Sequence, residues 1–192
     1  MRWDRSNLWG TSNKYQNKPI WSVGLSWNAS NEKFMQDVKW IDMLKVRTTY
    51  GIAGNVNPTY SPYMVTSANT NYNIGEPYQY VSTRPNSDLS WEKTTTTNIG
   101  VDFSLLHNRL RGSLDYYNKY GERLLATTQG VPTEGYGYSS YAINNGEMRN
   151  RGLELTLSGD VMRTRDLTWT LNAMLSLNNN KVTYVHVKAP VY

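Results

Sequence analysis

The most regular feature of this chain is a strict alternation of apolar and polar side chains over residues 20–30. Every second side chain in this segment is apolar, and the residues between them are small and polar. The apolar set is Trp21, Val23, Leu25, Trp27 and Ala29. Successive side chains of a β-strand point to opposite faces, so this pattern predicts a strand with one apolar and one polar face.

Five further segments show the same alternation and are predicted as strands. They are residues 44–53, 91–105, 110–120, 151–159 and 167–178. Together with residues 20–30 they predict an all-β fold, an antiparallel up-and-down meander with one apolar face and one polar face.

The connections between the six predicted strands alternate in length. Residues 31–43, 106–109 and 160–166 are short, whereas residues 54–90 and 122–149 are long and rich in Gly, Pro, Asn, Ser and Tyr. Meanders with short turns at one rim and long loops at the other are typical of bacterial outer-membrane barrels. Within the first connection, the spacing of Phe34, Val38 and Ile41 predicts a small helix.

Charged residues fall almost entirely on the polar faces of the predicted strands. These charges are Lys45, Arg47, Glu92, Asp102, Arg111, Asp115, Lys119 and Glu154. The apolar faces carry only Lys93 and Arg151, each at a strand end beside a long connection. A charge facing lipid at mid-bilayer costs about 2–4 kcal/mol, and far less at the interface. The distribution favours a sheet that forms part of a transmembrane barrel, with lipid on one face and water on the other.

Composition leaves a second interpretation open. The mean hydropathy is −0.64 and no long apolar run occurs, which excludes a membrane-spanning helix but not a spanning strand. A soluble all-β module, such as a carbohydrate-binding module, would also alternate apolar with polar residues. The length of the strands and the Trp residues near their ends favour the membrane interpretation. So does the set of 15 Tyr and 7 Trp against 2 Phe, because Tyr and Trp prefer boundaries between apolar and wet surroundings.

Three segments resemble one family. They are LKVRTTYGIAGN (residues 44–55), DLSWEKTTTTNIGVDFSLLHNRLRGSLDYYNK (88–119) and NNGEMRNRGLELTLSG (144–159). They are similar to the barrel strands of SusC/RagA-type TonB-dependent outer-membrane receptors. The resemblance implies a barrel of about 22 strands with an amino-terminal plug, in the outer membrane of a Gram-negative, Bacteroidota-like cell. It further implies import of oligosaccharides or peptides beneath a SusD-like surface lipoprotein, driven by the TonB complex.

We expect residues 1–192 to be a partial receptor barrel. The sequence contains no recognisable plug, TonB-contacting segment or aromatic terminal strand. Six strands are too few to close a barrel of that size, and an open edge in lipid would leave backbone groups unpaired. The chain is therefore expected to be a fragment of a longer transporter.

No catalytic, cofactor-binding or metal-binding residue is predicted. Asp102, Asp115 and Glu154 lie on the polar face, but their spacing does not pair them as a glycosidase acid and base. His107 and His186 have no partner at the spacing of a zinc motif. We therefore expect no enzyme activity, no cofactor and, since the basic residues are scattered, no nucleic-acid partner.

Tyrosines in the long connections are the one feature with a plausible binding role. They are Tyr60, Tyr63, Tyr72, Tyr78, Tyr80, Tyr136, Tyr138 and Tyr141. Such rings can stack on sugars or contact peptides. They can equally hold the loops together or contact the lipoprotein partner, and we favour that structural role for each of them.

Overall fold

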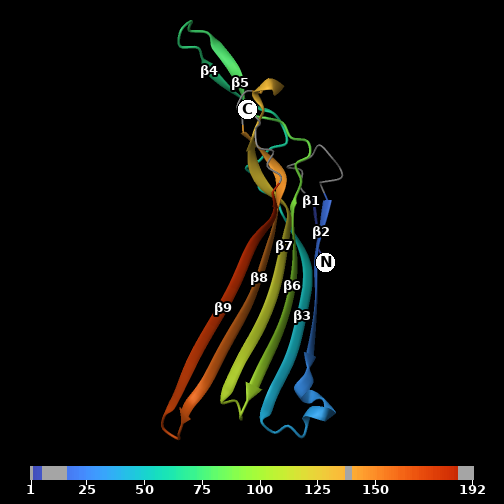
Figure 1. Cartoon of the computed structure of the whole chain (residues 1–192), viewed down its shortest axis with the longest axis vertical. Coiled ribbons are helices and arrows are strands. Elements are labelled where there is room, and N and C mark those ends of the chain that lie inside the picture. The colour runs from blue at the N-terminus through green and yellow to red at the C-terminus, as the bar shows by residue number, and fades with distance from the viewer. Residues whose placement is uncertain (1, 6–16, 137–139, 186–192) are drawn as a thin grey trace.

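The computed structural model describes residues 2–5, 17–136 and 140–185, most of which form one antiparallel sheet (Figure 1). Its strand order is β1-β2-β3-β6-β7-β8-β9. In that order the strands span Arg2–Arg5, Asn17–Asn28, Ile41–Asn55, Glu92–Leu105, Leu110–Gln129, Ser140–Arg163 and Thr168–Val185. Strands β4 (Val65–Thr70) and β5 (Pro77–Thr83) form a separate hairpin. Apart from this hairpin, strands adjacent in sequence are adjacent in the sheet, so the predicted meander is confirmed.

The helices of the described residues are short and of the 3-10 type. They are η1 (Ala29–Asn31), η2 (Lys33–Met35) and η3 (Pro132–Glu134). None of the helices in this part of the chain has the length and apolar character needed to cross a bilayer. The predicted helix through Phe34, Val38 and Ile41 is wrong. The η1 and η2 turns take up the first part of that segment, and β3 already begins at Ile41.

All six predicted strands are present, but the long connection predicted at residues 122–149 is wrong. Strand β7 continues to Gln129 and β8 begins at Ser140, so most of the segment is paired. The register between β7 and β8 shifts between Gly121 and Leu125, and Arg123 has a φ of 56°. A bulge of this kind breaks the period of two, which is why the pattern concealed the continuation of the strand.

The pairing register places the predicted apolar side chains in rows that cross the sheet. One row consists of Trp27, Val46, Val101, Leu114, Leu155 and Leu175. The neighbouring row on the opposite face consists of Ser26, Arg47, Gly100, Asp115, Glu154 and Ser176. Paired residues of an antiparallel sheet share a face, so the predicted separation of apolar and polar faces is confirmed.

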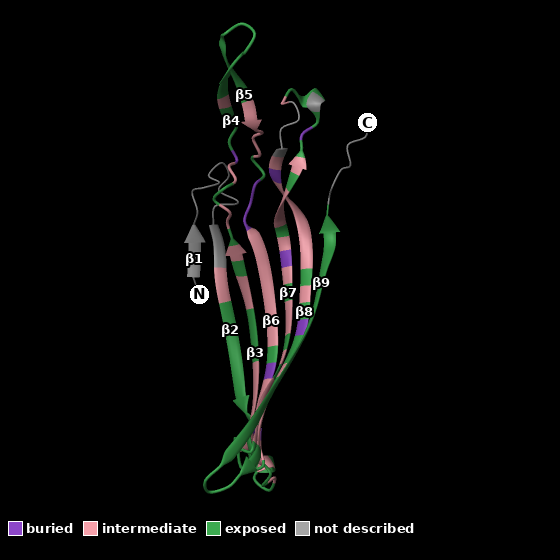
Figure 2. Ribbon diagram, turned by 90° about the vertical axis from the view of Figure 1, so that its left-hand side faces the viewer, coloured by how far each residue is buried: buried purple, intermediate pink, exposed green. Residues whose placement is uncertain are grey.

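The apolar face has no second layer among the described residues. Leu25 is 70% exposed and Leu175 is 52% exposed, and β2 and β9 are exposed over most of their described length (Figure 2). The described apolar residues that are buried are Ala29, Leu89, Trp91 and Ala142. A soluble sandwich would cover its apolar face with a second sheet. The described part of the chain lacks the layer that this alternative requires.

The apolar band also crosses the register rows obliquely. On β2 the apolar band ends at Trp27, and the register row through Trp27 reaches β9 at Leu175. On β9, however, the apolar residues extend six positions further, to Trp169. This displacement is about 20 Å along the strand, while the strands from β2 to β9 cover about 24 Å across the sheet. The strands are therefore tilted by roughly 40° relative to the direction perpendicular to the apolar band. Strands of membrane barrels have a similar tilt relative to the membrane normal.

Candidate functional site

The centre of the polar face is an arginine held between two carboxylates. Arg47 in β3 donates through Nε and Nη2 to the two Asp102 oxygens of β6, at 2.9 and 3.0 Å. Its Nη2 also lies 2.9 Å from the Asp115 carboxylate of β7. The side chains are 35%, 26% and 18% exposed, in the order Arg47, Asp102, Asp115. The cluster carries one cation against two anions, so a net negative charge faces the water.

A glycine makes this arrangement possible. Gly100 lies between Arg47 and Asp115 in the register. A Cβ atom at Gly100 would lie 2.5 Å from Asp115 Oδ1 and 2.9 Å from Arg47 Cζ. Because no side chain stands there, the guanidinium crosses β6 close to its backbone. The ion pairs thus lie flat on the polar face of the sheet, across β3, β6 and β7, and do not project from it.

A tyrosine lies along the same face one row away. The Tyr117 ring covers Gly152, where a Cβ atom would lie 2.3 Å from Tyr117 Cζ. Asn178 Nδ2 donates to the Tyr117 hydroxyl at 2.8 Å, and Lys119 Nζ lies 5.3 Å from the ring centroid. Glycines beneath large polar side chains therefore keep the polar face shallow in two places.

Hydrolysis by the acidic residues is not supported by this geometry. The Arg47 guanidinium occupies the space between Asp102 and Asp115, where a glycosidase would hold its substrate. Glu154 pairs with Asp115 in the register and lies on the same face. Within the described ranges, no group of three or more His, Asp or Glu side chains is placed to hold a metal. His107 lies in the β6–β7 turn with a φ of 56°, and His186 lies outside the described residues.

Residues 90–93 (SWEK), in the second family-like segment, contact the bulge between β7 and β8 and stabilise it. Glu92 Oε1 accepts a hydrogen bond from the Leu125 backbone N–H at 2.9 Å, and Glu92 Oε2 accepts one from Asn55 Nδ2 at 2.8 Å. Lys93 forms an ion pair with Glu122 at 2.6 Å. A bulge interrupts the ladder and leaves backbone groups in need of partners. The two charged residues of the motif stabilise the strand where its period breaks.

Asn144 from the third quoted segment completes this junction. Its Oδ1 accepts from the Ser90 N–H at 2.7 Å, and its Nδ2 donates to the carbonyls of Ser90 and Arg123 at 2.7 and 2.8 Å. Beside it, Leu89, Trp91 and Ala142 form a small core. The junction fixes the segment that leads from the β4–β5 hairpin into the sheet.

The described loop tyrosines fall into two groups. Arg84 lies 4.7 Å from the Tyr141 ring centroid and 5.3 Å from that of Tyr136, and it forms an ion pair with Glu134. Tyr60 packs against the small core. Those three tyrosines have contacts that hold the loops together, as we favoured.

The second group is more open to solvent. Tyr63 is exposed, Tyr72 is 99% exposed, and Tyr78 and Tyr80 are exposed with ring centroids 6.1 Å apart. A role for these four rings in binding stays a prediction. Tyr138 lies outside the described residues.

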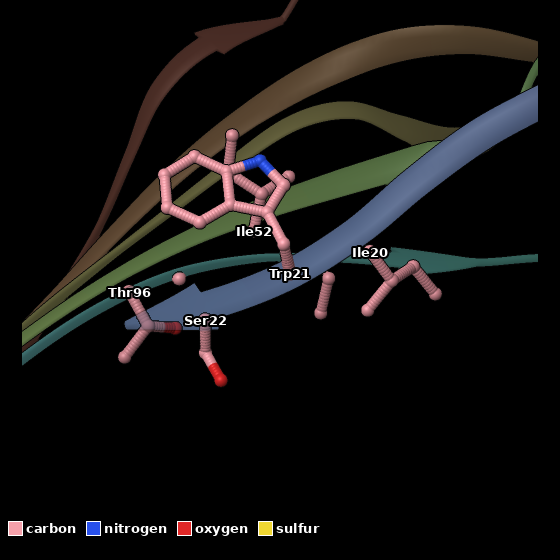
Figure 3. Close-up of a pocket in the computed structure, with 7 residues that line it drawn as sticks. Ile20, Trp21, Ser22, Ile52 and Thr96 are labelled. Carbon is pink, nitrogen blue, oxygen red and sulfur yellow. The ribbon is translucent and has the colours of Figure 1, made fainter. Parts of the chain in front are cut away.

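A shallow depression on the β2–β3 pair is lined by side chains from both faces of the sheet. In Figure 3, Trp21 and Ile52 point to one side of the strands, whereas Ser22 and Thr96 point to the other. The Trp21 ring packs against Tyr50 with centroids 5.6 Å apart. The depression is lined by residues of both faces, so it is a feature of a thin wall and not an enclosed ligand cavity.

Comparison with known proteins points to one group. Residues 1–191 match the family described as TonB dependent receptor-like, beta-barrel. The chain is 34% identical over 191 residues to TonB-dependent receptor SusC of Bacteroides thetaiotaomicron, covering 95% of this chain and 19% of that protein. It is 33% identical over 184 residues to TonB-dependent receptor P26 of Formosa agariphila, covering 94% of this chain and 18% of that protein.

A solved structure agrees with these relatives. The RagAB peptide importer in its closed-closed state superposes with a TM-score of 0.79 at 27% identity, over 92% of this chain and 19% of the matched chain. The chain thus spans about a fifth of the length of the curated relatives it matches. Its strands superpose on one section of the matched RagAB chain.

Proposed function

Because this chain belongs to the TonB-dependent receptor-like β-barrel family, we propose that it forms a section of the wall of an outer-membrane importer. The observation that carries the proposal is the pair of faces on a single-layered sheet. The apolar face is uncovered among the described residues, as a surface in contact with acyl chains would be. The polar face carries Arg47, Asp102 and Asp115, as the lining of a water-filled interior would.

The proposed orientation follows from the ends of the strands. The β6–β7 and β8–β9 connections are tight turns at one end, whereas the β4–β5 hairpin and residues 130–136 lie at the other (Figure 1). Outer-membrane barrels have short turns in the periplasm and long loops outside the cell. We place the hairpin and the exposed tyrosines at the cell surface on this basis.

We further propose that the section works within a longer receptor. Such a receptor would contain the plug, bind a SusD-like lipoprotein at the cell surface, and draw energy from the TonB complex. Its cargo would be an oligosaccharide or a peptide; the RagAB structure is described as that of a peptide importer. The wall itself would act as a structural and electrostatic boundary of the channel, not as an enzyme.

The test uses the full-length receptor expressed from its own gene. We expect it to be recovered with the outer-membrane fraction, to run as a heat-modifiable band, and to co-purify with a surface lipoprotein. Deletion of the gene should abolish growth on one class of oligosaccharide or peptide, and a copy of the gene should restore it. Recovery in the soluble fraction, without lipid or detergent, would contradict the proposal.

A further inference from the structure

The apolar face carries a group of basic residues just beyond the apolar band. Arg151 lies in β8 two residues beyond the apolar Leu153, and Arg149 follows two residues further on the same face. The register pairs Arg149 with Lys181 of β9. Arg149 and Lys181 lie outside the strand limits predicted from sequence, so the alternation pattern did not reveal this cluster.

The two arginines meet at one neutral oxygen. Arg149 Nε donates to Asn118 Oδ1 at 3.0 Å, and Arg151 Nε donates to the same atom at 3.3 Å. The Arg149 guanidinium also lies 6.0 Å from the Tyr120 ring centroid. Two like charges that share a neutral acceptor repel each other. A bound anion would remove that repulsion.

Within the described residues, Arg149, Arg151 and Lys181 form no ion pair with a carboxylate. The nearby Glu147 accepts a hydrogen bond from the Tyr120 hydroxyl at 2.5 Å. Arg47 and Lys93 differ in this respect, since Arg47 pairs with two aspartates and Lys93 pairs with Glu122. The cluster is thus a local excess of positive charge on the face that meets the membrane.

We propose that Arg149, Arg151 and Lys181 bind the phosphate groups of anionic lipids in the outer leaflet. Along the strands, Arg151 lies about 7 Å beyond the last apolar row, and Arg149 and Lys181 lie about 13 Å beyond it. This is the level at which lipid headgroups would lie. Guanidinium groups suit phosphate because their N–H donors match its oxygens in pairs. Aromatic rings mark the same boundary, with Tyr116 and Tyr120 on this face. The placement in the outer leaflet rests on the proposed function.

The test measures lipid binding to the purified full-length receptor in detergent micelles. Its probes are phosphorylated lipid A, the same lipid after enzymatic removal of its phosphates, and inorganic phosphate. Binding is followed by native mass spectrometry and by titration. We expect the wild-type receptor to bind the phosphorylated lipid about tenfold more tightly than the dephosphorylated one. The triple variant R149Q/R151Q/K181Q should reduce this preference to less than about twofold.

Two control variants separate the site from general charge effects. Lys93→Gln removes a cation of the same face that already has a carboxylate partner, and K45Q/K119Q removes two cations of the opposite face. Both should keep the wild-type preference. All variants are first required to give the wild-type heat-modifiable band, so that loss of binding is not loss of folding. A single variant, Arg151→Gln, serves if the triple variant does not assemble.

Three results would overturn the inference. One is a phosphorylated-lipid preference that survives in the triple variant. Another is equal binding of both lipid forms by the wild-type receptor. The third is saturation by millimolar inorganic phosphate with no extra affinity for the lipid, which would mean a free-anion site. A receptor that resides in the outer membrane yet shows one of these results would disprove the lipid site while leaving the proposed function intact.

Discussion

The two faces of this sheet hold arginine in opposite ways. On the polar face Arg47 lies between Asp102 and Asp115 above a glycine, so its charge is neutralised within the wall. On the apolar face Arg149 and Arg151 share one amide oxygen and have no carboxylate partner among the described residues. The comparison indicates that Arg47 is neutralised by carboxylates of the protein itself, whereas the charges of Arg149 and Arg151 are left for a partner in the surroundings.

Depth explains where each arrangement occurs. The row through Val101, Leu114 and Leu155 lies within the apolar band and carries no charge on its face. Basic residues appear on that face only beyond the band. The opposite face carries Arg47 and Asp115 in the middle of the same strands. In the proposed barrel, one strand would therefore meet lipid and water at the same height, on alternate residues.

The largest effect is expected from a charge placed in the apolar row. Leu155→Arg or Val101→Arg in the full-length receptor should destabilise the assembled barrel by about 2–4 kcal/mol, because the guanidinium would face lipid at mid-depth. The control is Thr156→Arg, which lies next to Leu155 but on the polar face. Urea titrations of the folded band in liposomes measure the difference. Equal losses for the two faces would contradict the assignment of lipid and water sides.

A smaller effect is expected where a polar side chain lies flat on the wall. Gly152→Ala introduces a Cβ atom into the space of the Tyr117 ring and should cost about 1–3 kcal/mol. The double variant G152A/Y117A should recover part of this loss, because the ring no longer competes for the space. Gly24→Ala is the matched control, since its nearest neighbour is the Thr49 methyl at 3.2 Å. The midpoint of the heat-modifiable transition gives the comparison.

Sequence alone predicted the faces correctly because alternation is a local property. Each apolar position between Trp21 and Leu177 in the regular parts of the strands is found on the predicted face, since pairing preserves the side on which neighbours lie. The failures occur where the backbone departs from that regularity. The bulge at Gly121–Leu125 reverses the period, so the outer parts of β7 and β8 were interpreted as a loop.

The functional features that the pattern missed are contacts between distant segments. The Arg47 cluster joins residues that are 55 and 68 positions apart, and the Arg149–Lys181 pair depends on the β8–β9 register. Predicting such contacts requires the pairing register of the strands. Alternation shows which face a residue lies on, but not which residue of the neighbouring strand it pairs with. Glu92 and Asn144 belong to the family-like segments named above. Only the bulge between β7 and β8 explains why these residue types occur there.

Removal of the carboxylate that serves the bulge should have a moderate effect. Glu92→Ala leaves the Leu125 N–H without its acceptor and should cost about 1–2 kcal/mol. Glu92→Gln should be milder, because an amide oxygen can still accept that hydrogen bond. The effect belongs to the rim, so outer-membrane recovery should stay near wild type while the β7–β8 extension becomes sensitive to protease. Equal stability of the Ala and Gln variants would argue against the hydrogen bond to Leu125 as the source.

The smallest effect tests the comparison of the two arginine clusters directly. Arg47→Lys replaces a fork that binds both Asp102 oxygens with a single ammonium. Because these side chains are partly exposed, the loss should be about 1 kcal/mol or less, and the difference from wild type should shrink as salt is raised. Arg151→Lys has no carboxylate pair to weaken and should change stability by less than about 0.5 kcal/mol. If both variants lost the same stability, and both losses shrank with salt, then both arginines would be neutralised by carboxylates of the protein. That result would contradict the difference between the two faces.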